Sequence, residues 1–169
     1  MSNAFKDWYN DFTEKQKQNY ELCMKYPILI PHHRLWGTVI KDYEYGHTEL
    51  DGMPDGWRIA FGEDWAREVQ AAINKLPEDV RDKVYITDIK EKYGYLHTYF
   101  SHYTDALREV IRKYDNLSER TCIRCGKPAT KISTGWISPW CDSCSNKIYD
   151  NCVDIDEWFN QYEEDENEG

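Results

Sequence analysis

Two cysteine pairs, Cys122-Ile123-Arg124-Cys125 and Cys141-Asp142-Ser143-Cys144, decide how the C-terminal third of this chain folds. Fifteen residues separate the inner cysteines, and the resulting C-x2-C-x15-C-x2-C spacing is typical of a four-cysteine metal site. Two thiolates in one tight turn can reach one ion, and Gly126 allows the backbone to turn just after the first pair. Four thiolates at about 2.3 Å in a tetrahedron suit Zn²⁺ and leave no position for water. The pattern therefore predicts a structural zinc ion held by Cys122, Cys125, Cys141 and Cys144.

Other interpretations of the same four cysteines stay open. Two disulfides would use the same residues, and so would a redox-active pair, although a redox motif normally comes as one pair beside a βαβ unit. We expect reduced cysteines, because nothing in the sequence indicates secretion. Iron in a rubredoxin-like site has the same ligands, so the sequence does not separate zinc from iron. Of the remaining cysteines, Cys23 is expected to be a buried, inert thiol, and no role is assigned to Cys152.

The loop between the cysteine pairs suggests a binding surface. The candidate binding residues are Trp136, Trp140, Arg124, Lys127 and Lys131. Exposed aromatic rings beside basic side chains could stack bases or grip a protein partner. The alternative is structural, because a small metal module has little core of its own and needs large side chains to cover it. We favour the structural role, with Trp136 buried and Trp140 partly exposed.

Upstream of the cysteines, the hydrophobic pattern predicts a small α+β domain over residues 5–118. Apolar residues recur at helical spacing in three segments and alternate in two others, which flank a turn. The expected helices are residues 5–25, 64–76 and 104–117, and the expected hairpin strands are residues 84–89 and 95–100. This order is typical of a small sheet or hairpin covered by helices. In the second strand, one face carries Tyr95, His97 and Tyr99 and the other carries Leu96, Thr98 and Phe100, and we expect one of the two faces to be core and the other partly exposed.

The region between the first two predicted helices has few periodic signals. Pro27 and Pro31 disfavour helix around them and predict an extended segment. Residues 32–63 contain several turn signals, so we expect irregular structure with one short strand near residues 37–43. The predicted zinc ribbon then occupies residues 119–152, and an acidic tail occupies residues 153–169.

Charge divides the chain into parts with different properties. The formal net charge is −10, but Val153–Gly169 contains eight acidic residues and no Lys or Arg. Residues 119–147 contain five basic residues against two acidic ones, which makes the predicted ribbon mildly basic. Runs of like charge are usually disordered. However, Ile155, Trp158 and Phe159 recur at helical spacing, so a short docked helix is expected over residues 154–162.

Common catalytic and targeting signals are absent from the sequence. It contains no G-x-x-x-x-G-K-[ST], G-x-G-x-x-G or G-x-S-x-G motif, and no H-x-x-x-H or H-E-x-x-H spacing. The histidines therefore predict no metal-dependent hydrolase, and we expect a protein that is not an enzyme. No signal peptide or membrane-spanning run is recognised, which predicts a cytoplasmic protein without a membrane partner. Met1–Ala4 has the composition of an expression-tag remnant and is left out of the fold prediction.

The segments Ile89–Leu96 and Leu117–Cys144, the latter including Lys131–Trp140, resemble small zinc-ribbon proteins of bacteriophages and gut bacteria. The resemblance spans roughly residues 27–145. It implies a phage-related or mobile-element context and no particular activity.

These observations predict a zinc-stabilised binding or adaptor protein. A protein partner is favoured because the chain outside the acidic tail is nearly neutral, and electrostatics dominate nucleic-acid affinity. The alternative is nucleic-acid binding through the ribbon and its Trp/Lys/Arg loop. The sequence predicts neither the identity of the partner nor the oligomeric state.

Overall fold

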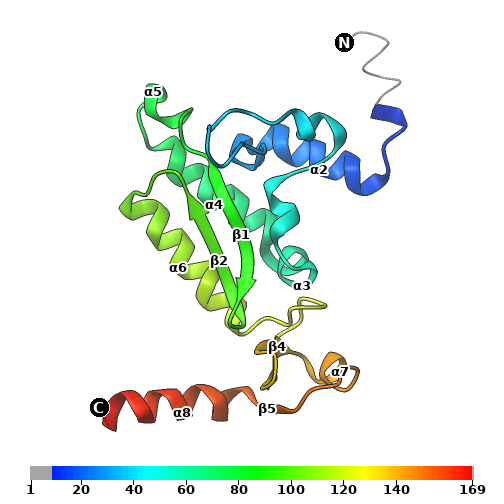
Figure 1. Cartoon of the computed structure of the whole chain (residues 1–169), viewed down its shortest axis with the longest axis vertical. Helices are drawn as coiled ribbons and strands as arrows, with labels where there is room; N and C mark the ends of the chain where they lie inside the picture. Colours follow the sequence, from blue (N-terminus) through cyan, green and yellow to red (C-terminus); the bar gives the residue numbers. More distant parts are fainter. Residues whose placement is uncertain (1–8, 169) are drawn as a thin grey trace. The chain divides into compact units, whose positions relative to one another are not determined.

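The computed structural model describes the backbone of residues 9–168, and the side chains of these residues except Asp42 and residues 162–168. The elements up to Arg81 are all helical, and strands and helices are mixed in the rest of the chain (Figure 1). Two small sheets are present among the described residues, one of two strands and one of three. The predicted mixture of helices with small sheets is therefore confirmed.

The first described helix with printed bounds, α2 (Glu14–Lys25), is shorter than the helix predicted from residue 5. Residues 5–8 of that prediction lie outside the described residues. Thr13 begins the helix with a capping box, because its hydroxyl accepts a hydrogen bond from the Gln16 N–H while the Gln16 side chain accepts one from the Thr13 N–H. This pair satisfies two helix N–H groups, so the chain breaks at residues 11–13 instead of continuing as one helix.

The segment between α2 and the next long helix consists of short turns. It contains three 3₁₀ helices, a one-turn α-helix and a π-helical turn. These are η1 (Pro27–Leu29), η2 (Lys41–Tyr45), η3 (Glu49–Gly52), α3 (Asp55–Trp57) and η4 (Arg58–Gly62). The extended segment predicted after Pro27 is wrong, because proline is tolerated at the first position of a helical turn. The strand predicted near residues 37–43 is reduced to a single bridge between His32 and Val39.

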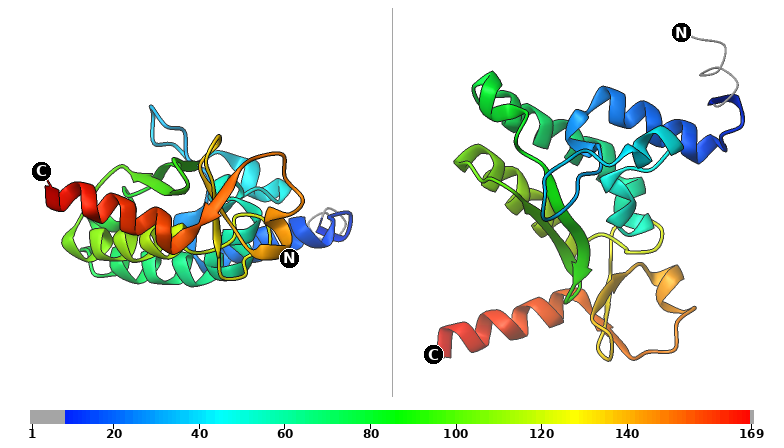
Figure 2. Two further views of the ribbon diagram at one scale, coloured as in Figure 1. Left: turned by 90° about the horizontal axis from the view of Figure 1, so that it is seen from below. Right: turned by 45° about the horizontal axis from the view of Figure 1, so that its top comes forward.

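The central helices and strands agree with the prediction. The helices α4 (Glu63–Asn74) and α6 (Asp105–Glu119) are both amphipathic, and a short helix, α5 (Glu78–Arg81), follows the first of them. Strands β1 (Ile86–Lys92) and β2 (Tyr95–Phe100) form a hairpin joined by a two-residue turn (Figures 1 and 2). One face of β2 is core and the other is more exposed, as predicted, and the structure shows that Leu96, Thr98 and Phe100 form the buried face.

The C-terminal region contains the three-stranded sheet. Strand β3 (Lys131–Ser133) lies between β4 (Ser138–Trp140) and β5 (Cys152–Asp154), and both pairings are antiparallel. A one-turn helix, α7 (Asp142–Ser145), follows β4. Helix α8 (Ile155–Glu168) continues directly from β5 (Figure 2) and is longer than the helix predicted over residues 154–162. The acidic side chains predicted after Gln161 lie outside the described side chains.

The described residues form two compact units. The first unit comprises the described part of Met1–Gly52 with Glu63–Ile89 and Thr98–Val110. The second unit comprises Met53–Gly62, Lys90–His97 and the described part of Ile111–Gly169, so the division falls within β1, β2 and α6. The largest fully buried side chains include Leu29, Trp65 and Ile86 in the first unit, and Trp57 and Leu96 in the second. The domain boundaries at residues 118 and 152 stay a prediction.

Candidate metal centre and adjoining groove

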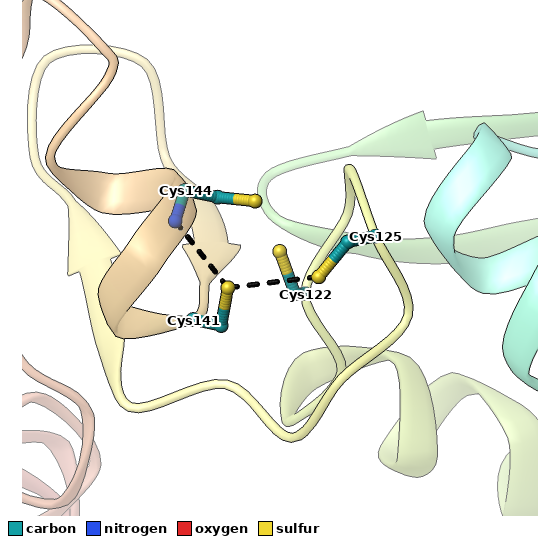
Figure 3. Close-up of side chains that lie close together, drawn as sticks. All are labelled: Cys122, Cys125, Cys141 and Cys144. Atoms are coloured by element: carbon teal, nitrogen blue, oxygen red, sulfur yellow. Dashed lines mark hydrogen bonds between the residues drawn. The ribbon is translucent and has the colours of Figure 1, made fainter.

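The four paired cysteines lie together in the second unit. Their sulfur atoms are all within 4.8 Å of one another, and the Sγ atoms of Cys125 and Cys141 are 3.6 Å apart. Figure 3 shows the four side chains pointing toward a common centre from two separate segments of the chain. Cys122, Cys141 and Cys144 are buried, and Cys125 is partly buried. The predicted ligand set is therefore brought into one cluster that could hold a metal ion.

Backbone hydrogen bonds shape the turn that carries the first cysteine pair. The N–H of Gly126 donates to the carbonyl of Cys122 at 3.0 Å, and the N–H of Cys122 donates to the carbonyl of Lys127 at 2.8 Å. Gly126 has φ +83°, a left-handed conformation that favours glycine. The turn therefore closes on itself and presents both sulfurs to the same side.

The second cysteine pair lies at the start of a helical turn. Cys141 is the N-cap residue of α7, and its Sγ accepts a hydrogen bond from the N–H of Cys144 at 3.4 Å. An N-terminal helical turn directs N–H groups toward a thiolate and stabilises its negative charge. The helical turn therefore directs an N–H group at the Cys141 sulfur.

The spacing of the sulfurs separates the possible interpretations. A disulfide requires an S–S distance of about 2.05 Å, and all six cysteines are free. Four sulfurs at about 2.3 Å from one ion in a tetrahedron would be about 3.8 Å apart. The 3.6 Å separation of Cys125 and Cys141 is close to that value. The residues present therefore fit a tetrathiolate metal site.

The cysteines of the cluster differ in their pKa values. Burial would raise the pKa of Cys122, but backbone N–H groups, led by that of Cys125, outweigh it and lower this pKa to about 7. Burial and the three neighbouring thiols raise the pKa of Cys144 to about 12. Four thiolates cannot coexist here at neutral pH unless a bound cation compensates their charge.

Of the two tryptophans of the inter-cysteine loop, one lies as predicted and the other does not. Trp136 is 75% exposed, so the prediction that it is buried is wrong. Trp140 is partly exposed as predicted, and its ring packs against the cysteine cluster while its Nε1–H donates to Ser133 Oγ at 3.0 Å. Trp140 is therefore the ring that covers the cysteines.

Trp136 is held on an ordered turn despite its exposure. The backbone N–H groups of Gly135 and Trp136 donate to the two carboxylate oxygens of Asp150, at 3.0 and 2.9 Å. The hydroxyl of Ser133 donates to the carbonyl of Trp136. The backbone hydrogen bonds to the Asp150 carboxylate, led by that from the Trp136 N–H, lower the pKa of Asp150, which therefore remains an anion. The backbone on both sides of the exposed ring is fixed.

A surface groove of about 450 Å³ adjoins this turn. It is lined by Glu91, Lys92, Tyr93, Gly135, Trp136 and Ile137. The turn of the β1–β2 hairpin lies against the Trp136 turn, because a Cβ atom placed on Gly94 would be 3.0 Å from Ile137 Cγ2. Tyr93 is 68% exposed, so an aromatic ring from each turn lines the groove. We call this feature the Tyr93–Trp136 groove.

The three basic residues of the predicted binding surface do not lie together in one element of the structure. Arg124 and Lys127 are exposed on the turn of the first cysteine pair, and Lys131 is partly buried in β3. None of these three lines the groove. Sequence reasoning missed Tyr93, although the Tyr93-Gly94 hairpin turn was a visible signal. It also missed Asp150, for which no local pattern exists.

Comparisons with known proteins give no family assignment. No protein-family model matches the chain, and neither the curated proteins nor the solved structures that were searched include a match. Within residues 9–168, no helix combines the length and the apolar character needed to span a membrane. The functional argument therefore rests on the site itself.

Proposed function

We propose that this protein is a zinc-stabilised binding protein that contacts a protein partner through the Tyr93–Trp136 groove. The observation that carries the proposal is Trp136, which is exposed but has both adjoining N–H groups bonded to Asp150. Large aromatic side chains on rigid backbone lose little conformational entropy on binding and are frequent anchors of protein interfaces. In line with the resemblance to phage zinc-ribbon proteins, we place this adaptor in a phage or mobile-element context.

The metal in this proposal is one Zn²⁺ ion, and the segment around it is a zinc ribbon. Four cysteine sulfurs complete a tetrahedral shell, so the ion would be structural rather than catalytic. Structural zinc contributes on the order of 10 kcal/mol of apparent binding free energy at pH 7, which is folding free energy for a small module.

Elemental analysis of the purified, unchelated protein tests the metal assignment. We expect one equivalent of zinc in the wild type and in Cys152→Ser, and less than a tenth of that in Cys122→Ser and Cys144→Ser. Cys152 is the matched control because it is a free cysteine of the same unit outside the cluster. Iron in place of zinc, or less than half an equivalent of any metal, would contradict the assignment.

Charge at the groove favours a protein partner. Glu91 and Lys92 both line the groove, so its ionisable lining has no net charge. Nucleic-acid affinity depends mainly on neutralising phosphates with several basic side chains. An apolar, aromatic and electrically balanced groove instead resembles the central part of a protein interface.

Backbone strain at Tyr93 adds support. Tyr93 and Gly94 have φ +57° and +85°, the pattern of a two-residue hairpin turn in which Asn or Gly is preferred at the first position. A tyrosine there costs about 1 kcal/mol relative to such residues. The ring is largely exposed, so burial within the chain does not offset this cost. A role in binding accounts for a tyrosine at this position.

Quantitative co-purification from the native host tests the partner proposal. Wild type, Trp136→Ala, Tyr93→Asn and Trp36→Ala would be compared. Trp36 is the matched control because it is an equally exposed tryptophan, at 76%, in the first unit. We expect one stoichiometric protein whose recovery falls at least tenfold in the first two variants and is unchanged in the third. The same loss in Trp36→Ala, or no loss in Trp136→Ala, would contradict the proposal.

The alternative function is nucleic-acid binding through the basic turn of the ribbon. It is motivated by the exposure of Arg124 and Lys127 beside the first cysteine pair. Mobility shifts with single- and double-stranded probes, repeated at two salt concentrations, would separate the alternatives. A salt-dependent shift that Arg124→Ala and Lys127→Ala weaken would favour nucleic acid.

A further inference from the structure

A cavity of about 390 Å³ lies in the first unit and shares no lining residue with the Tyr93–Trp136 groove. Its walls come from the end of α2, from η1, from the His32–Val39 bridge, from the C-terminal half of α4 and from the segment between α5 and β1. The volume falls within the range of small-molecule sites in proteins. The distribution of donors, acceptors and charges in its walls indicates what it could bind.

The side-chain amide oxygens of Gln70 and Asn74 in the cavity wall already accept hydrogen bonds. The side-chain oxygen of Gln70 accepts a hydrogen bond from the N–H of Ile28 at 2.8 Å. The Gln70 amide nitrogen donates to the side-chain oxygen of Asn74 at 3.0 Å. This chain of bonds orients the Asn74 amide so that its NH₂ group, which only donates, remains for a further partner.

Arg81 adds a fixed positive charge to the same wall. Its Nη2 atom donates to the carbonyl oxygens of Asn74 and Leu76, at 3.0 and 3.1 Å, and so ties the guanidinium to the end of α4. Its Nε atom is buried and has no hydrogen-bond partner among the described residues. Carbonyl groups do not neutralise a guanidinium, and in the described part of the chain no carboxylate forms an ion pair with Arg81.

The charged residues of the lining are two cations, Lys25 and Arg81, and one acidic residue, Asp82. Lys25 lines the cavity, and its partner Glu63, at 3.3 Å, does not. Burial lowers the pKa of His32, so this ring is neutral at pH 7, and its Nδ1 bonds the carbonyl of Ile30 at 2.7 Å. Asp82, which is exposed, is the one acidic residue of the lining.

The remaining lining is apolar. Ile28, Ile73 and Val84 are buried and belong to three different elements or connections of the first unit. An apolar floor beside a wall of donors offers little to a fully hydrated ion such as phosphate. It suits a molecule with an anionic end and an apolar body.

We propose that this cavity binds a small organic anion. The anionic head, a carboxylate or a phosphate ester, accepts hydrogen bonds from Asn74 and the Arg81 guanidinium and lies near the ammonium of Lys25. The apolar body of the ligand rests on Ile28, Ile73 and Val84. Hydrogen bonds between ionised groups are about twice as strong as neutral ones, so the head sets the orientation of the ligand.

Calorimetric titration of the zinc-loaded full chain with four probes tests this proposal. The probes are octanoate, octyl phosphate, octanol and inorganic phosphate. We expect at least one of the first two to bind at a single site and at least tenfold more tightly than both octanol and inorganic phosphate. Whichever of the two binds more tightly identifies the head group. Failure of both organic anions to bind, or equal binding of octanol, would overturn the proposal.

Three variants test whether the ligand binds in this cavity. Asn74→Ala and Lys25→Met remove a donor and a charge but leave intact the backbone carbonyls to which Arg81 is bound. Each is expected to weaken the preferred anion at least fivefold. Lys75→Met is the matched control, because Lys75 is an exposed neighbour of Asn74 that does not line the cavity, and it should leave the affinity unchanged. Binding that all three variants leave unchanged, or at several sites per chain, would overturn the assignment.

Discussion

The backbone N–H of Gly56 donates a hydrogen bond to the carbonyl oxygen of Ile123, at 2.9 Å, in the turn between the first two cysteines. Gly56 packs so closely against this turn that a Cβ atom on Gly56 would collide with the Cys122 carbonyl oxygen. Close by, the buried indole N–H of Trp57 donates to the carbonyl of Thr121 at 2.9 Å. The turn that carries the first cysteine pair is thus supported by a segment more than sixty residues away in sequence.

Gly56→Ala should therefore destabilise the second unit. The added methyl group meets backbone rather than a flexible side chain, so we expect a loss of about 1–3 kcal/mol in unfolding free energy. Denaturant unfolding followed by Trp fluorescence would measure it. Gly135→Ala is the matched control, because a Cβ there meets only the end of the Asp150 side chain. If both variants unfolded at the same denaturant concentration, the close approach of Gly56 to the cysteine turn would not contribute to the unfolding free energy.

The exposure of Trp136 predicts a separation between stability and binding. Trp136→Ala should change the unfolding free energy by less than about 0.5 kcal/mol, as for other surface positions. Trp57→Ala should cost about 3–5 kcal/mol, because that ring is fully buried in the same unit. Iodide quenching of single-tryptophan variants would show the same order of exposure. A large loss of stability in Trp136→Ala would support the structural role first expected for this ring.

Asp115 makes stability depend on pH. Burial, and secondarily the nearby carboxylate of Glu119, raise the pKa of Asp115 from 3.8 to about 7. Its Oδ1 atom is buried without a hydrogen-bond partner among the described residues. The folded protein therefore keeps this proton between about pH 4 and pH 7, where the unfolded chain has released it. Because the folded state binds more protons there, stability falls as the pH rises through this range and levels off above it.

Asp115→Asn should remove this dependence. We expect the variant to gain on the order of 1–2 kcal/mol over the wild type at pH 8 and about half as much at pH 5.5, after allowance for the partial exposure of the side chain. Denaturant unfolding at both pH values would measure the difference. Asp105→Asn, on the same helix but with a fully exposed carboxylate, should give no such difference. An equal effect of Asp115→Asn at both pH values would contradict the raised pKa.

The chain after the cysteines contributes unequally to stability. Strand β5 pairs with β3, and Ile155 is buried while its N–H donates to the carbonyl of Thr130 at 3.0 Å. Arg120 holds the beginning of α8, through an ion pair with Asp156 at 2.9 Å and by lying over the ring of Phe159 at 4.7 Å. The ion pair is largely exposed and should contribute under about 1 kcal/mol.

Two truncations test this division. Deleting residues 163–169 should leave the melting temperature nearly unchanged, because a run of acidic residues buries little apolar surface. Deleting residues 153–169 removes part of β5 together with Ile155, and should cost on the order of 3 kcal/mol or more. Thermal unfolding by circular dichroism would measure both. Identical melting of the two truncated proteins would show that β5 and the start of α8 do not stabilise the unit.

Local chemistry in the sequence was enough to predict several features. The four cysteines were predicted to converge because each pair reaches one ion from a single turn, and the structure clusters them. Helices α4 and α6 were predicted because apolar residues recur at helical spacing over three or more turns. The break before α2 was missed although its capping box, Thr13 to Gln16, is visible in the sequence.

Other features were decided by contacts between distant parts of the chain. Trp136 lies exposed on a turn whose backbone N–H groups bond to Asp150, and the order of residues does not reveal that pairing. Gly56 and Trp57 support the cysteine turn by hydrogen bonds to Ile123 and Thr121 that no periodic pattern encodes.

The sequence by itself thus determined the ligand set and the long amphipathic helices, because these depend on spacing within one turn or one helix. Only the tertiary structure decided which aromatic rings are covered, where the groove and the cavity lie, and which segment supports the metal centre. Those outcomes depend on which distant backbone and side-chain groups satisfy one another when the chain closes, and that choice is made by the whole fold.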